Sequence, residues 1–424
     1  MLHRIICLFI LLPLVGCASN RQTSNDVVIW ISIDGLRHDY VDRDRDRLPT
    51  LAQLITHGAF TRELAPVFPS VTFPSHISQA TGVPVSEHGV TGNTFYDSRT
   101  KQTYKYPEES SLIGAEPIWI TAARQGVRSA VIQWPMSYRQ TGRVRADYFD
   151  DHFDKDATDV DRLARLLQVW RDDDPSQHRG TPLRLLMSYV LAPDKAGHKY
   201  GPDSRELRGA VVETDHLLGE FLVEAQRLFA RDHAAHPKDR LWIVLTTDHG
   251  MSPAKGQLKI DEVLGVGSER KFHATITGPI ANLFVGDRSE AQEIVRRLRR
   301  DPRIRAWARD ELPSRWHYAH PKRTGDVVAM LDIGWGWKSS ESTTKSTQPA
   351  TTQSNDPLGQ HGYAVEEDPD MLGFGVIAAI GAQTDSRDLD RVDSLRLHPT
   401  VARLLGIHPA RGATGRAIDL KAGE

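Results

Sequence analysis

The sequence predicts an α/β fold with a mostly parallel central sheet that is covered by helices on both faces. Short apolar runs rich in β-branched residues alternate with segments whose apolar residues follow the period of an α-helix. Strands that alternate with helices favour parallel pairing, because each crossover helix returns the chain to the same end of the sheet. The chain has 424 residues, of which 39% are hydrophobic, enough for one large α/β domain.

The first strand is expected in "VVIWISID", which is apolar and β-branched and stops at Asp34-Gly35. The next segment, "LPTLAQLITHGA", has apolar residues at helical spacing and a glycine near its end, where helices usually stop. Further strands and helices are predicted in the same way. The predicted strands cover residues 27–34, 129–134, 183–192, 240–247 and 372–382, and the predicted helices cover residues 48–59, 204–232 and 290–301.

One low-complexity segment interrupts this pattern. The stretch "KSSESTTKSTQPATTQSNDP" (338–357) has no core-forming residues, and we expect it to be a disordered surface loop. No internal repeat and no clear domain boundary is visible. We therefore expect residues 27–424 to form one domain with insertions.

The charge of the chain argues against one class of partner. The formal net charge is −2, and no basic stretch carries interleaved aromatic residues. A strong positive field is what draws a protein to the phosphate backbone. We therefore expect no nucleic-acid polymer as a partner.

The N-terminus has the pattern of an export signal. A basic start, "MLHR", precedes "IICLFILLPLV" (5–15), an apolar run of 11 residues that is too short to span a bilayer as a helix. The run ends in "LVGC", which resembles a bacterial lipobox. This resemblance implies a lipoprotein signal peptide over residues 1–16, a lipid on Cys17 and a lipidated tether over residues 17–26. The alternative is an ordinary cleaved signal peptide.

The lipobox resemblance also implies a location. An exported, lipid-anchored protein would sit at the bacterial cell envelope and face the periplasm or the cell surface. Residue 18 is Ala rather than Asp, which favours the outer membrane by resemblance to the sorting pattern of such lipoproteins. The two cysteines are Cys7 and Cys17, so the mature fold would contain no disulfide.

Carboxylates and imidazoles follow several of the predicted strands. In open α/β sheets ligands bind beyond the carboxyl ends of the strands, so we expect these side chains to converge on one edge. Thr72, in "FPSVTFPSH" (68–76), follows the first strand–helix unit, and a helix is expected to begin just after it, with Pro74 in its first turn. The converging residues are Asp34 after the first strand, Asp194 and His198 after the third, Asp248 and His249 after the fourth, and His361 after the low-complexity segment.

These residues stand in motifs that occur in a familiar order. The motifs are "SIDGLR", "PVFPSVTFPSHISQATG", "HGVTGNTFYD", "EPIWITAARQG", "QWPMSY", "PDKAGHKYGP", "TDHGM" and "QHGY". They resemble the nucleotide pyrophosphatase/phosphodiesterase family of the alkaline phosphatase superfamily, from residue 27 to about residue 363. The resemblance implies an alkaline-phosphatase-like fold, with residues 27–424 as a single catalytic domain, and a two-zinc enzyme with a threonine nucleophile.

The resemblance also implies two sets of zinc ligands. Carboxylate and imidazole side chains suit Zn²⁺ on chemical grounds as well, and oxygen-only metals such as Mg²⁺ would not favour three histidines. One zinc would be held by Asp194, His198 and His361, and the other by Asp34, Asp248 and His249, with Thr72 Oγ as its fourth ligand.

Three further residues match substrate-binding positions of the family. Asn93 matches an asparagine that donates to a phosphoryl oxygen, and Phe73 matches an aromatic residue that stacks on a nucleobase. Phe153 aligns with the aromatic residue on the opposite side of the base. Two aromatic faces would hold a planar base between them. His76 and Ser75 are not needed by this mechanism, and we expect them only as helix residues.

The implied reaction is hydrolysis of phosphodiester or phosphoanhydride bonds through a covalent threonine intermediate, with release of nucleoside monophosphates. Phosphate monoester hydrolysis and cleavage of lipid head-group diesters stay open as alternatives, and a non-catalytic lipid-anchored binding protein is a remote one. No motif for the Arg or Lys pair of a monoesterase is present. Val71 stands where many vertebrate members of the family carry Lys, which weakens the case for tight triphosphate recognition.

Overall fold

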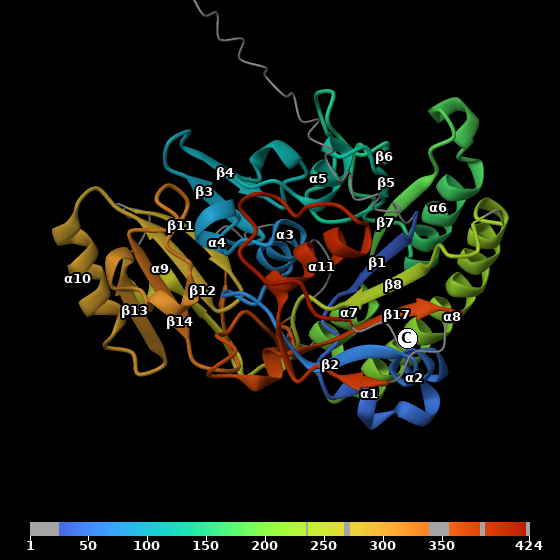
Figure 1. Ribbon diagram of the computed structural model, residues 1–424. Helices are drawn as coiled ribbons and strands as arrows, with labels where there is room; N and C mark the ends of the chain where they lie inside the picture. Colours follow the sequence, from blue (N-terminus) through green and yellow to red (C-terminus); the bar gives the residue numbers. More distant parts are fainter. Residues whose placement is uncertain (1–24, 235, 267–271, 339–355, 382–385, 421–424) are drawn as a thin grey trace, which may run out of the picture.

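The computed structural model describes residues 25–234, 236–266, 272–338, 356–381 and 386–420 (Figure 1). The predicted signal peptide (1–16), Cys17 and nearly all of the tether 17–26 lie outside the described residues. Most of the predicted loop 338–357 also lies outside them. None of the described helices is long and apolar enough to cross a membrane.

The largest sheet has nine strands in the order β18-β2-β17-β8-β1-β7-β5-β6, with β19 paired to β2. Strands β8, β1, β7, β5 and β6 run parallel to one another, whereas β17 is antiparallel to both β2 and β8. The predicted α/β fold with a mostly parallel sheet is therefore confirmed. The strands are β1 Val27–Ile33, β2 Gly58–Ala65, β5 Arg128–Val131, β6 Tyr148–Phe149, β7 Leu183–Val190, β8 Leu241–Thr246, β17 Gly373–Ile380, β18 Arg387–Asp388 and β19 Arg391–Asp393.

Helices cover both faces of this sheet (Figure 1). The predicted helix 48–59 corresponds to α2, which begins one residue later and ends three residues earlier, and the predicted helix 204–232 corresponds to α8, which begins one residue later and ends as predicted. Each face has its own apolar core, because the strands alternate their side chains between the two faces. One face is packed by α2 (Pro49–Thr56), α6 (Asp159–Asp172) and α8 (Arg205–Asp232), and the other by α3 (Thr72–Thr81), α5 (Ile118–Arg124) and α11 (Leu397–Leu404).

A smaller antiparallel sheet lies at the left of Figure 1 and has a third apolar core, which it shares with two helices. The predicted helix 290–301 is α10, but the sequence analysis missed the sheet itself. Its four strands have five residues each, too few for alternation of apolar and polar residues to stand out from chance. The elements are α9 Ile260–Leu264, β11 His273–Thr277, β12 Ile280–Phe284, α10 Arg288–Leu298, β13 Ile304–Ala308 and β14 Val327–Leu331.

The small sheet supports the loop that leads to Thr72. Phe68 packs in one cluster with Ile280 and Val328 of this sheet, and its ring stacks on that of Trp316 with the centroids 4.0 Å apart. The remaining elements are short and connect these layers. They are α1 Tyr40–Arg43, α4 Val85–His88, β3 Thr94–Asp97, β4 Gln102–Lys105, α7 Ala192–Tyr200, β9 Ser252–Pro253, β10 Gly256–Lys259, β15 Trp335–Lys338 and β16 Gly359–Gln360, besides single turns of 3₁₀-helix.

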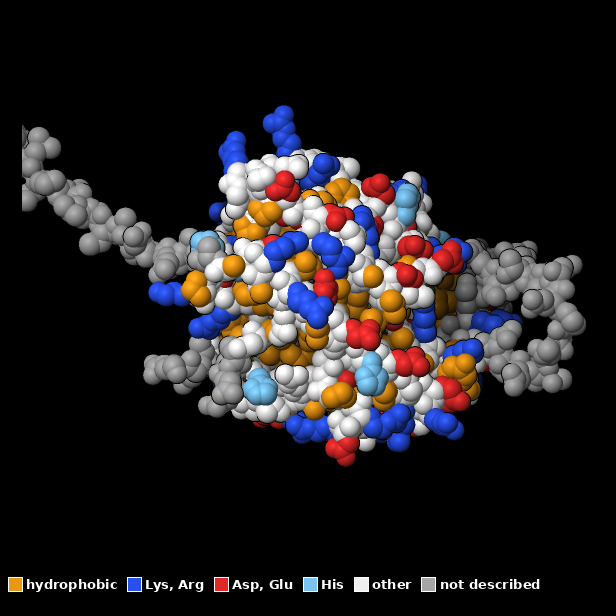
Figure 2. Space-filling view, turned by 90° about the vertical axis from the view of Figure 1, so that its right-hand side faces the viewer, with side chains coloured by type: hydrophobic (Ala, Val, Ile, Leu, Met, Phe, Trp, Pro, Cys, Tyr) orange, Lys and Arg blue, Asp and Glu red, His pale blue; other side chains and the backbone are white. Residues whose placement is uncertain are grey.

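The surface shows no field of a single sign on the side that carries α6 and α8. Basic and acidic side chains are interspersed there with smaller apolar areas (Figure 2). This distribution agrees with the formal net charge of −2.

Candidate active site

The site lies at the carboxyl edge of the central strands. Strand β1 runs between β7 and β8, with Ile33 opposite Val190 and Ser32 opposite Thr246, so the three strands end side by side. The residues that follow these ends meet, as the strand-end argument predicts. Two groups of three side chains with their ligand atoms within 4.8 Å of one another could each hold a metal ion, namely Asp194, His198 and His361, and Asp34, Asp248 and His249.

The first group is built on α7. Asp194 and His198 are four residues apart, so both side chains lie on one side of this helix, and His361 joins them from the loop after β16. His198 Nε2 lies 3.4 Å from Asp194 Oδ1, and His361 Nε2 lies 3.7 Å from the same oxygen. The two Nε2 atoms are 3.2 Å apart.

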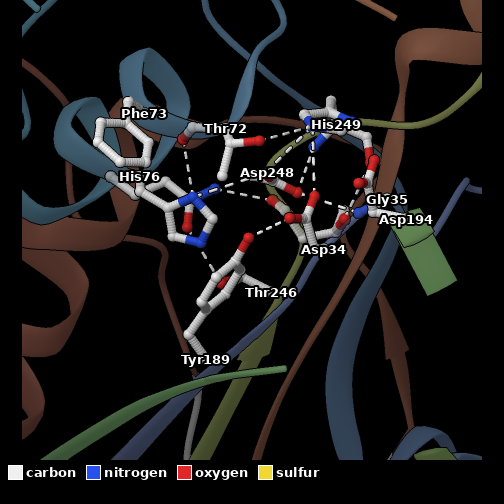
Figure 3. Close-up of polar contacts among 12 residues, drawn as sticks. Asp34, Gly35, Thr72, Phe73, His76, Tyr189, Asp194, Thr246, Asp248 and His249 are labelled. Carbon is white, nitrogen blue, oxygen red and sulfur yellow. Dashed lines mark hydrogen bonds and ion pairs between the residues drawn. The ribbon is translucent and has the colours of Figure 1, made fainter. Parts of the chain in front are cut away.

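The predicted nucleophile, Thr72, lies beside the second group. Asp34 Oδ1, Asp248 Oδ2 and Thr72 Oγ1 lie 3.3, 3.2 and 3.4 Å from His249 Nε2 (Figure 3). Thr72 is the first residue of α3, and its side chain is 8% exposed. The rings of His249 and His361 are stacked with their centroids 3.6 Å apart, so the two groups share one site.

All three histidines present the same ring nitrogen to this site. A carbonyl oxygen can only accept a hydrogen bond, so a ring nitrogen that contacts one must carry the proton. Nδ1 therefore carries a proton in each ring, and Nε2 is the ring nitrogen that faces the site. The Nδ1 atoms of His249, His198 and His361 donate to the carbonyl oxygens of Gly250 at 2.8 Å, Gly359 at 2.9 Å and Ser70 at 3.0 Å.

Asp34 and Asp248 also have one oxygen that is hydrogen-bonded within the fold and one that is not. Asp248 Oδ1 accepts from the backbone N–H groups of Gly35 and His249, and Asp34 Oδ2 accepts from the Tyr189 hydroxyl. The other oxygen of each, Asp34 Oδ1 and Asp248 Oδ2, is buried and accepts no hydrogen bond, and the same holds for Asp194 Oδ1. A buried, unbonded carboxylate oxygen is costly unless a cation binds it.

The electrostatics also favour a bound cation. Burial raises the pKa of Asp34 well above its ordinary value, and the carboxylates of Asp194 and Asp248 raise it further. Burial and the neighbouring rings of His249 and His198 hold the pKa of His361 well below its ordinary value, so this imidazole stays neutral. The site thus gathers carboxylates and neutral imidazole lone pairs, which a divalent cation would stabilise.

Two buried side chains support the ligands from behind (Figure 3). Tyr189 of β7 holds Asp34, as described above. His76 Nδ1 donates to the carbonyl oxygen of Thr72 at 2.8 Å and lies 3.5 Å from Asp248 Oδ2. The sequence analysis treated His76 only as a helix residue, and the structure adds this contact. Its spacing of four residues from Thr72 was the available signal, because such positions lie one helical turn apart.

Asn93 lies beside the start of α3. Its Oδ1 accepts from the backbone N–H of Phe73 at 2.9 Å. This bond fixes the amide so that Oδ1 is occupied by the helix and the Nδ2 group remains as a donor. The structure thus places Asn93 beside Phe73, the residue that follows Thr72.

Thr72, Phe73, Asn93 and Phe153 all line one cleft of about 570 Å³ together with ligands of both groups. Tyr106 extends the aromatic wall, with its ring 5.8 Å from that of Phe73 in an edge-to-face arrangement. The sequence analysis did not assign several lining residues, because neither a loop position nor a place in a motif or regular element shows which side chains face the cleft. They are Tyr106, Glu108, Gln133, Tyr138, Lys155, Tyr189 and Lys195.

Comparison with known proteins identifies the family. The model of the family described as "Type I phosphodiesterase / nucleotide pyrophosphatase" matches residues 28–364. The chain belongs to this family. An uncharacterised pyrophosphatase/phosphodiesterase of Schizosaccharomyces pombe is 31% identical over 84% of this chain and 72% of its own. The chain is therefore an enzyme of this family, a hydrolase of phosphoric ester and anhydride bonds.

Two further proteins are similar over most of their length. The bis(5'-adenosyl)-triphosphatase of Xenopus laevis is 27% identical over 96% of this chain and 84% of its own. A structure of murine ectonucleotide pyrophosphatase/phosphodiesterase 5, an inactive variant in complex with AMP, superimposes with a TM-score of 0.74 at 23% identity, covering 91% of this chain and 96% of its own. The predicted alkaline-phosphatase-like fold agrees with this likeness.

The contact between Tyr189 and Asp34 can be tested by substitution. Tyr189→Phe keeps the ring and removes the hydroxyl that donates to Asp34 Oδ2. We expect the affinity for the bound divalent cation to fall about 10- to 100-fold, because second-layer partners orient the ligands. Competition with a chelator, followed by measurement of protein-bound metal, gives this value. Tyr148→Phe is the matched control, since its hydroxyl donates to Asp173 outside the site. Equal affinities in the two variants would refute the role of Tyr189.

Proposed function

We propose that the protein is a two-zinc nucleotide pyrophosphatase/phosphodiesterase that forms a covalent intermediate on Thr72 and releases nucleoside monophosphates. The observation that carries this proposal is the position of Thr72 Oγ1, 3.4 Å from His249 Nε2 within the second ligand group. The contact of this hydroxyl is to a nitrogen that could itself bind a metal ion. The hydroxyl faces a group of metal-ligating atoms and a cleft.

The spacing of the ligand atoms supports zinc at both groups. Bonds of about 2.0–2.2 Å to a tetrahedral Zn²⁺ place neighbouring ligand atoms about 3.3–3.6 Å apart. In the first group these atoms are 3.2–3.7 Å apart, and in the second they lie 3.2–3.4 Å from His249 Nε2. Three histidines among six protein ligands also favour Zn²⁺ over metals that prefer oxygen.

In the proposed reaction Thr72 Oγ1 forms a bond to phosphorus while the bond from phosphorus to the leaving oxygen breaks, and the proton lost by Thr72 is balanced by the proton that the leaving oxygen takes from solvent. A water oxygen then forms a bond to phosphorus, the Oγ1–phosphorus bond breaks, and one proton of that water restores the Thr72 hydroxyl. Bound zinc would lower the pKa of the attacking hydroxyl and neutralise charge on the phosphoryl and leaving oxygens. Asn93 donates from Nδ2 to a phosphoryl oxygen, and Phe73 N–H holds the amide in that orientation.

The aromatic wall supports a nucleotide as substrate. Phe73, Tyr106 and Phe153 line the cleft that Thr72 opens into, and aromatic rings stack on any nucleobase. The similar protein of Xenopus laevis is a bis(5'-adenosyl)-triphosphatase, and bis(5'-adenosyl) triphosphate is a dinucleotide. Phosphate monoesters and lipid head-group diesters are the alternatives, and the experiment below separates them.

Hydrolysis of paired substrates tests this function. The p-nitrophenyl ester of thymidine 5'-monophosphate is a diester, and p-nitrophenyl phosphate is the matching monoester. We expect the diester to be preferred, and Thr72→Ala to lower kcat/KM for it by at least about 10³-fold, because the nucleophile is lost. Thr72→Ser should retain part of the activity, since it keeps a hydroxyl.

The control for this experiment is Thr56→Ala, which removes an exposed threonine hydroxyl at the end of α2. Acid quenching during turnover, followed by mass spectrometry, should show a nucleoside monophosphate attached to Thr72. A monoester preference would indicate the phosphatase alternative, and a fully active Thr72→Ala variant would disprove the threonine intermediate.

We also propose that the enzyme acts at the bacterial cell envelope, anchored by a lipid on Cys17. The "LVGC" motif at the end of the apolar run supports this location. We expect Cys17→Ser to move the protein from the membrane fraction to the soluble fraction, because the acyl chains provide the anchor. Cys7→Ser is the control, since that residue would leave with the signal peptide. Membrane retention of Cys17→Ser after a salt wash would contradict the lipid anchor.

A further inference from the structure

Glu108 connects two walls of the cleft. It lies two residues after Tyr106, and its side chain lines the cleft. Glu108 Oε1 accepts from the backbone N–H of Phe153 at 3.0 Å, and Oε2 lies 2.9 Å from His152 Nδ1. Arg139 Nη2 lies 3.4 Å from the same Oε2. The Glu108 carboxylate thus links the loop after Tyr106 to the backbone of the loop that carries Phe153.

The loop around Phe153 depends on such side chains for its shape. Residues 150–158 form no helix or strand, so their backbone groups lack the regular hydrogen bonds of secondary structure. Gln133 provides one substitute, because its Oε1 accepts from Asp154 N–H at 3.0 Å and its Nε2 donates to the carbonyl oxygen of His152 at 3.2 Å. Together with Glu108, it fixes the backbone on both sides of Phe153.

The Phe153 ring is held as well as its backbone. The guanidinium of Arg162 lies 4.9 Å from the ring centroid, and the Tyr138 ring lies 6.3 Å away in an edge-to-face arrangement. Arg162 is buried and donates to the carbonyl oxygen of Asp154 at 2.8 Å. Arg162 and Tyr138 therefore hold the Phe153 ring in place, and Phe153 still lines the cleft.

Backbone strain is concentrated around this wall. Tyr106, Gln133, Met136 and Arg139 have positive φ angles of 45°, 60°, 57° and 47°, although none of them is glycine. Such conformations cost free energy and persist only where the surrounding structure enforces them, most often at functional sites. Their position around the Phe73–Tyr106–Phe153 wall indicates that this wall is built in advance of the substrate.

We infer that Glu108 is a positioning residue for base recognition, which holds Phe153 in place as an aromatic wall for a planar nucleobase. This inference rests on the proposed function, because the nucleotide is the substrate that brings such a base. Removal of the Glu108 carboxylate frees the Phe153 backbone, so the ring loses its fixed position and the base loses a preformed surface. The phosphate of the same nucleotide is recognised elsewhere in the cleft, near Thr72 and Asn93.

Equilibrium binding tests this inference without any turnover. AMP and ribose 5-phosphate differ by the base, so the ratio of their Kd values reports base recognition alone. Isothermal titration calorimetry with the metal-loaded protein gives both values. In Glu108→Ala we expect this ratio, Kd of ribose 5-phosphate over Kd of AMP, to fall about tenfold, in line with the stacking contribution of one aromatic residue. Glu108→Gln keeps an oxygen that can accept from Phe153 N–H and should restore most of the ratio.

Glu109→Ala is the matched control, because this neighbouring carboxylate pairs with Arg139 Nη1 at 3.3 Å and does not contact Phe153. An unchanged ratio in Glu108→Ala, or a loss that is equal for both ligands, would overturn the inference. A wild-type ratio near one would also overturn it. Base recognition without hydrolysis would instead leave the positioning role intact and disprove the proposed catalytic function.

Discussion

Three carboxylates held close together, two of them buried, are the constraint on which the site depends. Asp34, Asp194 and Asp248 each turn one unbonded oxygen into a space that also receives three imidazole lone pairs. Burial raises the pKa of Asp34, and the neighbouring carboxylates of Asp194 and Asp248 raise it further. A fold that contained such a group without a cation would lose stability, so the surrounding hydrogen bonds serve to hold ligands in readiness for metal.

The central sheet provides the rigid frame for this arrangement. Strands β1, β7 and β8 end side by side, and each delivers at least one ligand directly or through a short helix. Backbone groups hold the atoms of these side chains that do not face the site. Gly35 N–H donates to Asp248 Oδ1, and three backbone carbonyl oxygens accept from the Nδ1 atoms of the histidines. Thr72 enters from α3 on the opposite side of the site, held there by His76 and next to Asn93. The proposed nucleophile and the candidate metal ligands therefore come from separate elements that meet at one edge.

Much of this frame could be predicted from the sequence, and the reasons are physical. The strands β1, β7 and β8 are continuous apolar runs, and buried parallel strands require such runs. Ligands that follow a strand end are placed by topology, which made their convergence predictable, whereas their division into two groups of three was implied by the family resemblance. The small antiparallel sheet was missed because five-residue strands carry little periodicity. Tyr189, His76 and Glu108 were missed because their roles depend on contacts between segments that are distant in sequence, such as Glu108 with Phe153, or on side chains turned inward from a regular element.

The central claim is that the two groups of ligands hold two zinc ions. The most direct test is the zinc content of the purified protein after zinc loading and dialysis, measured by elemental mass spectrometry beside His361→Ala and His249→Ala. The account predicts two zinc ions per chain in the wild type and about one in each variant, because each variant loses a ligand of one group. A wild-type protein with one zinc or none, or variants that retain both ions, would contradict it.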